Sequence, residues 1–221
     1  MSAYYFSFPL DAKLQQTLDF LLTNHAKGQY ADASVPVTLA VGTTDGVIKA
    51  LALDVIDILK TNGEGAGVLG MLANLLKSTM HTLIKQIMGK VSNAEQDKLA
   101  GYLSRRRVMV NGAARFGFSM PDAIGSRFES VLKRIAAGDM TNSREDLTSA
   151  MNDFINLSTA CFYDEFTGAL DLGFVKQKMV SMGRSAILKG SQSAVAKLFV
   201  SMSDDDLKRV CAHYDSMFVK A

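Results

Sequence analysis

Five basic residues stand close together in the sequence with no acidic residue among them: Lys98, Arg105, Arg106, Arg107 and Arg115. The window without acids extends from position 98 to position 121. The whole chain has 24 Lys and Arg against 22 Asp and Glu, so its formal charge of +2 hides this local excess. Guanidinium and ammonium groups at this density bind phosphates and other anions. The window is therefore the first candidate for a binding site.

The segments that carry these cations are predicted to be a helix and then a β-hairpin. Residues 94–106 fit a helix, and the β-prone run Arg-Val-Met-Val follows it. Asn111-Gly112 comes next, and Asn-Gly between β-prone runs is a strong hairpin signal because both turn positions need a positive φ. Winged-helix proteins approach DNA with a helix followed by a basic hairpin. Segment 98–118 therefore supports a nucleic-acid-binding or anion-binding hypothesis.

The same cations also have a purely structural interpretation. Arg105, Arg106 and Arg107 fall at the C-terminal end of the predicted helix, where unpaired carbonyl groups favour positive charge. They can then pair with acidic residues elsewhere in the fold. The near balance of charge over the whole chain argues against a surface that binds nucleic acid everywhere. The sequence leaves both interpretations of the cluster open.

Other residue types with catalytic or metal-binding chemistry lack the spacing that such chemistry needs. His25, His81 and His213 have no partner at a metal-ligand spacing, and Cys161 and Cys211 fall on apolar helical stripes, which favours buried free thiols. The sequence has neither a G-x-S-x-G turn nor a G-x-x-x-x-G-K-[ST] phosphate loop. We therefore predict no catalytic residue, no metal and no cofactor, and the chain leans towards a non-enzymatic role.

An apolar stripe between Gly65 and Met88 supports a different hypothesis. Its face is unusually rich in Leu and Met, which suits an apolar-ligand pocket or contact with a membrane surface. The glycines that open the stripe mark a flexible turn or a close approach of another helix. The spacing of Gly65, Gly67 and Gly70 is not read as a dinucleotide fingerprint, because no strand precedes it. The charge-free run from Gly65 to Leu76 is too short to span a bilayer.

The elements that must position these residues are mainly helices. From Leu10 to Phe218, apolar residues recur three and four positions apart, which predicts amphipathic helices that bury one another. The predicted fold class is all-α, a single bundle of about eight or nine helices with one small β-hairpin near Asn111-Gly112. Ser34–Thr43, which contains Pro36, is left open between a short strand, a buried loop and a helical turn.

Local signals set the predicted helix boundaries. Three starts pair a serine with an acid three residues later, the arrangement of a capping box: Ser92 with Glu95, Ser143 with Asp146, and Ser203 with Asp206. Pro121 opens one helix, Thr44 caps another, and Asn62-Gly63 closes the latter. Two short helices are predicted over 175–188 and 194–202, and a last one ends with Phe218.

The chain is predicted to be one domain over 1–221, with weak subdivision near 111–119 or 137–142. A hydrophobic content of 48% and twelve methionines suit a packed helical bundle. No secretory signal is recognised, so we expect a cytoplasmic protein. By elimination, the predicted role is a non-enzymatic helical binding or regulatory module with a protein partner. The alternatives are nucleic-acid binding through segment 98–118, and binding of an apolar ligand or a membrane surface.

Overall fold

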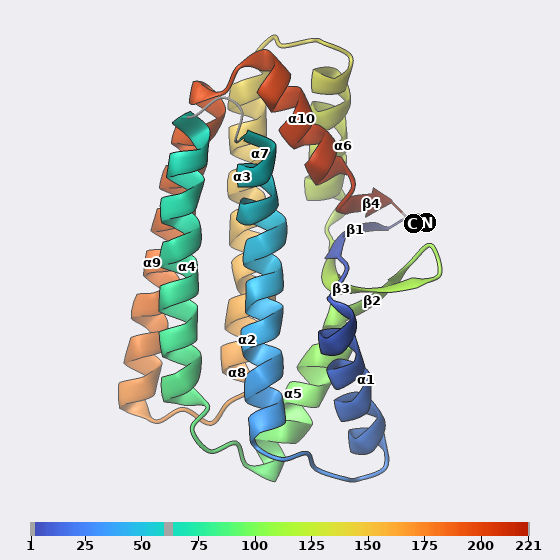
Figure 1. The fold of residues 1–221 in the computed structure, drawn as a ribbon, viewed down its shortest axis with the longest axis vertical. Coiled ribbons are helices and arrows are strands. Elements are labelled where there is room, and N and C mark those ends of the chain that lie inside the picture. The colour runs from blue at the N-terminus through green and yellow to red at the C-terminus, as the bar shows by residue number, and fades with distance from the viewer. Residues whose placement is uncertain (1–2, 60–63, 221) are drawn as a thin grey trace.

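The structure is a computed structural model in which residues 3–59 and 64–220 are described. It is 75% helical and contains a small antiparallel sheet, which confirms the predicted all-α bundle with a minor β element. The described residues form eight helices when segments that are continuous with one another are counted as one helix. Long helices form one side of the molecule, and the sheet with shorter helices forms the other (Figure 1).

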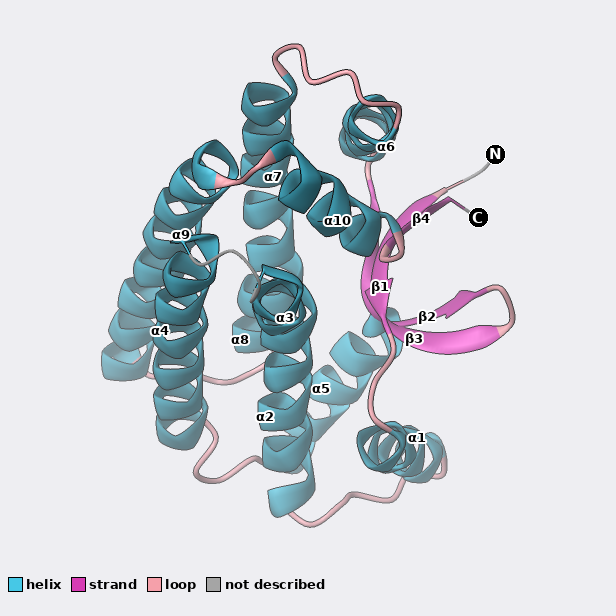
Figure 2. Ribbon diagram, turned by 45° about the horizontal axis from the view of Figure 1, so that its top comes forward, coloured by secondary structure: helices cyan, strands magenta, loops and turns pink. Residues whose placement is uncertain are grey.

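Four long helical rods form the bundle within the described residues. Their segments are α2 (Ser34–Ile48), the π-helical η1 (Lys49–Leu53), α3 (Asp54–Leu59), α4 (Glu64–Ile87), α7 (Ser143–Thr159), the π-helical η2 (Ala160–Asp164), α8 (Glu165–Gly168) and α9 (Phe174–Ser201). Segments α2, η1 and α3 form one rod, and α7, η2 and α8 form another. Helix α4 packs along α2 and α9, and α9 packs along α7 (Figures 1 and 2).

Two of the rods are longer than the sequence predicted. Ser34–Thr43 is the first part of α2, so the strand and loop alternatives were wrong, and Thr44 lies inside the helix rather than at its cap. Pro36 is tolerated because the first-turn N–H groups have no helical partner. The two short helices predicted over 175–188 and 194–202 are one continuous helix, α9. Packing outweighs the local helix-breaking signals in both rods.

The four shorter helices surround the sheet and cover the ends of the bundle. They are α1 (Ala12–Ala26), α5 (Asn93–Arg106), α6 (Asp122–Ala136) and α10 (Asp204–Asp215). The predicted capping box at Ser92 is confirmed, and Ser203 caps α10. The predicted cap at Ser143 was wrong, because Asn142 (φ 52°) precedes the helix and the Ser143 hydroxyl donates to the Asp139 carbonyl oxygen. The predicted helix end at Asn62-Gly63 lies outside the described residues.

A four-stranded antiparallel sheet has the order β2-β3-β1-β4. Its strands are β1 (Tyr4–Phe8), β2 (Arg107–Val110), β3 (Ala113–Met120) and β4 (Phe218–Lys220). Positive φ angles at Asn111 (51°) and Gly112 (78°) confirm the predicted hairpin between β2 and β3. The other two strands come from the chain ends, and the last helix was wrongly extended to Phe218, which belongs to β4.

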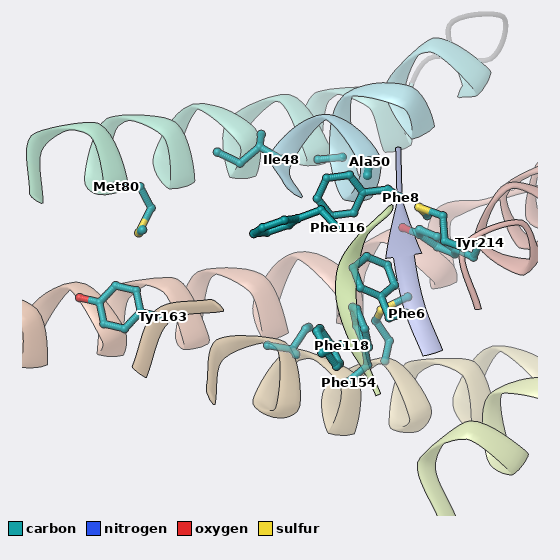
Figure 3. Close-up of a cluster of buried hydrophobic side chains, with 14 of the residues drawn as sticks. Phe6, Phe8, Ile48, Ala50, Met80, Phe116, Phe118, Phe154, Tyr163 and Tyr214 are labelled. Carbon is teal, nitrogen blue, oxygen red and sulfur yellow. The ribbon is translucent and has the colours of Figure 1, made fainter. Parts of the chain in front are cut away.

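Aromatic side chains join the sheet to the bundle. Phe6 lies opposite Phe118 in the register of β1 and β3, and alternation places both on the same face of the sheet. The Phe6 ring packs against Phe154 of α7 at 4.8 Å between ring centroids, and Phe116 stacks on Phe162 of η2 at 5.7 Å. Figure 3 shows Phe6, Phe118 and Phe154 grouped where the sheet meets α7. The sheet therefore closes the side of the bundle that contains the two π segments.

The N-terminal end of β1 is hydrogen-bonded to α6. The Tyr4 hydroxyl donates to the Glu129 carboxylate at 2.6 Å. The hydrogen bond from Lys133 and the one from Tyr4 lower the pKa of Glu129 to about 2. A Cβ atom at Gly125 would lie 2.2 Å from the Tyr4 ring, so this close approach requires glycine in α6.

Candidate functional site

An apolar cavity lies between the four rods of the bundle. We call it the bundle cavity. Its lining residues are Thr44, Val47, Ile48, Leu51, Ala52, Leu69, Leu72, Leu76, Met80, Met151, Phe154, Ile155, Ser158, Thr159, Phe162, Tyr163, Ile187, Ser191, Val195, Leu198 and Tyr214. In Figure 3, Met80 and Tyr163 point toward each other from opposite helices. Among the described residues of this lining there is no Asp, Glu, Lys, Arg or His.

Helical spacing explains how each rod presents residues to the bundle cavity. Helix α4 contributes four side chains three or four positions apart: Leu69, Leu72, Leu76 and Met80. These lie on one face of the helix, because 3.6 residues make a turn. They belong to the apolar stripe Gly65–Met88 that the sequence connected with an apolar ligand. Helix α9 contributes Ile187, Ser191, Val195 and Leu198 at the same spacing.

Both π-helical segments contribute to the lining of this cavity. Leu51 and Ala52 come from η1, and Phe162 and Tyr163 come from η2. A π turn inserts one extra residue into an α-helix and is frequent at functional sites. Two such turns from rods far apart in the sequence therefore meet at a single space. This coincidence marks the bundle cavity as the candidate site.

Most polar groups in the lining are already bonded to the protein. The hydroxyls of Ser158 and Thr159 donate to the Ile155 carbonyl oxygen. The Tyr163 hydroxyl donates to the Val180 carbonyl oxygen at 2.7 Å, and burial, with Asp164 nearby, raises the pKa of Tyr163 to about 12. The Tyr214 hydroxyl donates to the Leu51 carbonyl oxygen, and burial raises the pKa of Tyr214 as well.

Two hydroxyl groups in the lining remain available. Within the described part of the chain, no hydrogen bond is made by the side chain of Thr44 on α2 or of Ser191 on α9. Ser191 is 8% exposed, so the protein covers most of its surface. Both hydroxyls can donate and accept hydrogen bonds. The cavity thus offers a large apolar surface with two neutral polar positions.

The size of the bundle cavity suits a small hydrophobic molecule. Its volume is about 140 Å³, close to the roughly 150 Å³ of an engineered apolar cavity in another protein that stays dry and binds benzene. The space between the lining side chains, with the opening to solvent included, totals about 940 Å³. A smaller apolar pocket of about 20 Å³ adjoins it and shares Thr44 and Phe162.

The five cations singled out in the sequence lie outside this cavity and bind acceptors within the protein. Arg105 and Arg106 both contact the Glu165 carboxylate, at 3.1 and 3.2 Å. Lys98 pairs with Asp171 at 2.7 Å, and Arg107 pairs with Asp19 at 3.1 Å. Arg115 donates to the carbonyl oxygens of Ser7 and Ser216. All five cations therefore have partners within the protein, and those partners come from separate segments of the chain.

Arg106 is the most buried of these cations. It is 5% exposed, and its guanidinium lies 5.7 Å from the centre of the Tyr102 ring. The Nε and Nη1 atoms of Arg106 have no hydrogen-bond partner among the described residues. Glu165 is its counter-charge, so this arginine connects α5 to α8. The contacts of Arg105, Arg106 and Arg107 match the structural interpretation of a helix end paired with acids.

The histidines and cysteines also lie apart from one another. His25 pairs with Asp97 and His81 with Asp45, whereas His213 donates to the Ala50 carbonyl oxygen. Burial raises the pKa of the Cys211 thiol to about 12 and also raises that of Cys161, which keeps both thiols protonated. Over residues 3–59 and 64–220, no group of three or more His, Cys, Asp or Glu side chains is placed to hold a metal ion.

One charge pattern escaped the sequence reasoning. Positions 172–203 contain five basic residues and no acid, a longer acid-free window than 98–121. This window contains the whole of α9, which lines the bundle cavity on one side. A count of charges in windows of helix length would have found it.

In the described chain, no helix is long and apolar enough to cross a lipid bilayer.

The comparisons with known proteins give no relative of this chain. No protein-family model, no curated protein sequence and no solved structure matches it.

Proposed function

We propose that this protein binds a small apolar molecule inside the bundle cavity. The observation that carries this proposal is a single space enclosed by four helical rods, lined by apolar side chains and by two π segments. Ligand sites are typically concave, mostly apolar and supplied with a few polar groups that fix orientation. The unbonded hydroxyls of Thr44 and Ser191 supply such groups here.

The lining also defines the chemistry of the ligand. An ionised group buried among these side chains would lose its hydration without gaining a counter-ion, which is strongly unfavourable. A neutral molecule with one hydroxyl or carbonyl group fits better, because Thr44 or Ser191 can form a hydrogen bond with it. We therefore assign the cavity to uncharged, weakly polar hydrophobes. A longer ligand would place its remaining part in the open region of the cavity.

A series of primary alcohols of increasing chain length tests this function. A ligand that binds only the folded protein raises its stability by about 2.7 kcal/mol at 100 times its dissociation constant. Each added methylene that becomes buried contributes about 0.8 kcal/mol, close to a fourfold gain in affinity. Thermal unfolding should therefore shift upward with chain length until the cavity is full. Native mass spectrometry of the purified protein should also reveal a co-purified neutral hydrophobe.

Charged ligands of the same length provide the matched control. Alkyl carboxylates and alkylammonium ions should give much smaller shifts than the alcohol, because their charge cannot enter the lining. The proposal fails if none of the alcohols stabilises the protein, or if stabilisation is independent of chain length. Equal stabilisation by all three head groups would indicate surface adsorption instead.

The two other functions derived from the sequence remain predictions. One is the binding of a protein partner in an exposed groove between helices. Nucleic-acid binding through Lys98, Arg105, Arg106, Arg107 and Arg115 is tested by titration with duplex DNA at two salt concentrations. Nucleic-acid binding by this segment is excluded if the protein does not bind DNA at low salt, or if replacing the arginines with alanine leaves the affinity unchanged.

A further inference from the structure

The outer face of α9 carries a stripe of residues exposed to solvent. Eight exposed residues spaced three or four apart run along the whole helix: Phe174, Lys178, Met182, Ser185, Lys189, Ser193, Ala196 and Val200. This spacing places them on one side of an α-helix. The opposite side of α9 lines the bundle cavity.

Large apolar side chains on this stripe face solvent. Phe174 is 82% exposed, Val200 is 72% exposed and Met182 is 65% exposed. On the adjacent helix α4, Met71 is 70% exposed. Helices α4 and α9 lie side by side at the edge of the bundle away from the sheet (Figures 1 and 2). We call the exposed sides of these two helices the α4–α9 face. Exposed apolar residues of this size, grouped on one face, indicate an interaction surface.

The same face is basic. Helices α4 and α9 together contain seven Lys and Arg residues and one acid, Glu64. Lys178 and Lys189 lie on the exposed stripe, and Lys197 lies at its edge. These three lysines have no acidic partner among the described residues. Of the other cations on these helices, Lys77 pairs with Asp45 and Arg184 pairs with Asp164. Lys178, Lys189 and Lys197 therefore give the α4–α9 face unpaired positive charge next to exposed Phe, Met and Val side chains.

We propose that the α4–α9 face docks onto an anionic lipid membrane surface. A helix that presents lysines and large apolar residues on one side binds in the interface plane, because apolar groups enter the acyl boundary and lysines reach the lipid phosphates. Lysine suits this position, since its methylene stem covers apolar surface while its ammonium group extends to the head groups.

Other occupants fit this face less well. A second copy of the chain would bring the lysines of both stripes together without an acidic partner, so like charges would oppose each other. A nucleic acid would leave Phe174 and Met182 without an apolar partner, because phosphate contacts do not use such side chains. A lipid surface satisfies the apolar and the basic residues together.

Co-sedimentation with vesicles tests the proposal, with phosphatidylcholine vesicles compared with vesicles that also contain phosphatidylserine. The wild-type protein should bind the anionic vesicles more tightly, and binding should weaken when ionic strength rises from about 0.1 M to about 1 M. Each lysine near an anionic surface contributes about a fivefold gain. The triple variant Lys178→Gln, Lys189→Gln, Lys197→Gln should therefore bind roughly 100-fold more weakly.

A second triple variant controls for net charge. Lys13, Lys27 and Lys208 are exposed and lie outside α4 and α9. Replacing these three lysines with glutamine changes the formal charge equally but should leave vesicle binding almost unchanged. An equal loss in both triple variants would overturn the proposal, because binding would then follow the net charge of the protein rather than the α4–α9 face.

A fluorescence experiment locates the bound face. The chain has no tryptophan, so Phe174→Trp introduces a single reporter on α9, and Phe20→Trp introduces one at a position of α1 that is 56% exposed. Anionic vesicles should shift the emission of Phe174→Trp to shorter wavelength and leave that of Phe20→Trp unchanged.

The proposal is overturned by an absent shift, by an equal shift with neutral vesicles, or by release from vesicles when duplex DNA is added. A shift that follows protein concentration without vesicles would assign the face to a second copy. Docking does not depend on ligand binding in the cavity, so the two proposals fail separately.

Discussion

Replacing Ser191 with leucine should stabilise the protein and abolish ligand binding. The bundle cavity has a volume of about 140 Å³, and empty space in a closed apolar core costs about 24 cal/mol per Å³ in lost packing. A leucine at this position fills part of the space and replaces a hydroxyl that makes no hydrogen bond in the described chain. We expect the free energy of unfolding to rise by about 1–2 kcal/mol, since the new side chain recovers part of the lost packing.

Thermal and urea unfolding, followed by circular dichroism, measure this effect. A gain of this size raises Tm by about 2–8 °C in a chain of this length. The alcohol that stabilises the wild-type protein most should no longer stabilise Ser191→Leu. The matched control is Ser193→Leu, two residues along α9 on its exposed side, which should change neither stability nor ligand binding appreciably. If Ser191→Leu lowers stability and retains full stabilisation by the alcohol, the ligand binds elsewhere and the reasoning is refuted.

Three further predictions test the fold around the cavity. Glu165→Gln should lower the free energy of unfolding by roughly 2–3 kcal/mol, because it leaves the buried Arg106 cation without its counter-charge. Arg106→Met should lower it by less, because no buried charge is then left unpaired. Urea unfolding measures both variants, and a larger loss for Arg106→Met would contradict this pairing. Gly117→Ala should lower the free energy of unfolding by about 3 kcal/mol or more, because its Cβ would lie 2.0 Å from a backbone oxygen of β1. Thermal unfolding measures this loss, and a Tm equal to that of the wild-type protein would disprove the close contact between the strands. The lowered native pKa of Glu129, about 2, means that its contribution to stability is present above the unfolded pKa and is lost as the pH falls towards 2. Carboxyl NMR titration should show this midpoint, and Tyr4→Phe should raise it; an unchanged midpoint would remove the hydroxyl as a cause.

The sequence predicted correctly those turns and helix caps whose geometry depends on residues adjacent in the chain. Asn111 and Gly112 both adopt positive φ, as a tight hairpin requires, and Ser92 forms the capping box expected from Glu95. Strands β1 and β4 were missed because each is short and is stabilised by pairing across almost the whole chain. The run Tyr-Tyr-Phe-Ser-Phe at the N-terminus alternates in the manner of a strand, but its partners are not local.

Helix continuity was mispredicted where packing compensates for a poor helix former. Gly190 costs roughly 1 kcal/mol relative to alanine in an isolated helix, yet it lies within α9 because α4 approaches it closely. A Cβ atom there would lie 2.7 Å from a Leu75 methyl carbon. The predicted close approach at the glycines of α4 is absent at Gly67 and Gly70, where an added Cβ would meet nothing within 4 Å. Glycine alone does not reveal which positions have a close neighbour.

The candidate site was only partly accessible from the sequence. The apolar stripe of α4 was recognised, and it does line the bundle cavity. The π segments carry no recognisable sequence signal, and the rods that meet around the cavity are far apart in the chain. Arg105, Arg106 and Arg107 are consecutive, yet they bind acids on α8 and α1. The acids that pair with these arginines are far from them in the sequence, so the pairing could not be predicted from the cluster.

The π segments give a physical reason for the cavity. A π turn departs from the regular α-helical hydrogen-bond ladder, so its carbonyl groups become available to side chains of neighbouring helices. In η1, the Ala50 and Leu51 carbonyl oxygens accept hydrogen bonds from His213 and Tyr214 of α10. In η2, the Phe162 carbonyl oxygen accepts one from Tyr102 of α5. Side chains on two other helices thus hold both irregular turns in place.

This arrangement leaves an open space between the helices. Regular α-helical turns at both positions would lack the extra residues and would let α2 and α7 present continuous apolar stripes to each other. Hydrogen bonds from α5 and α10 fix both π turns beside the remaining space. A ligand of the proposed kind would make packing contacts in this space. The irregular turns therefore form part of the cavity lining, and the proposed apolar ligand would contact residues of both.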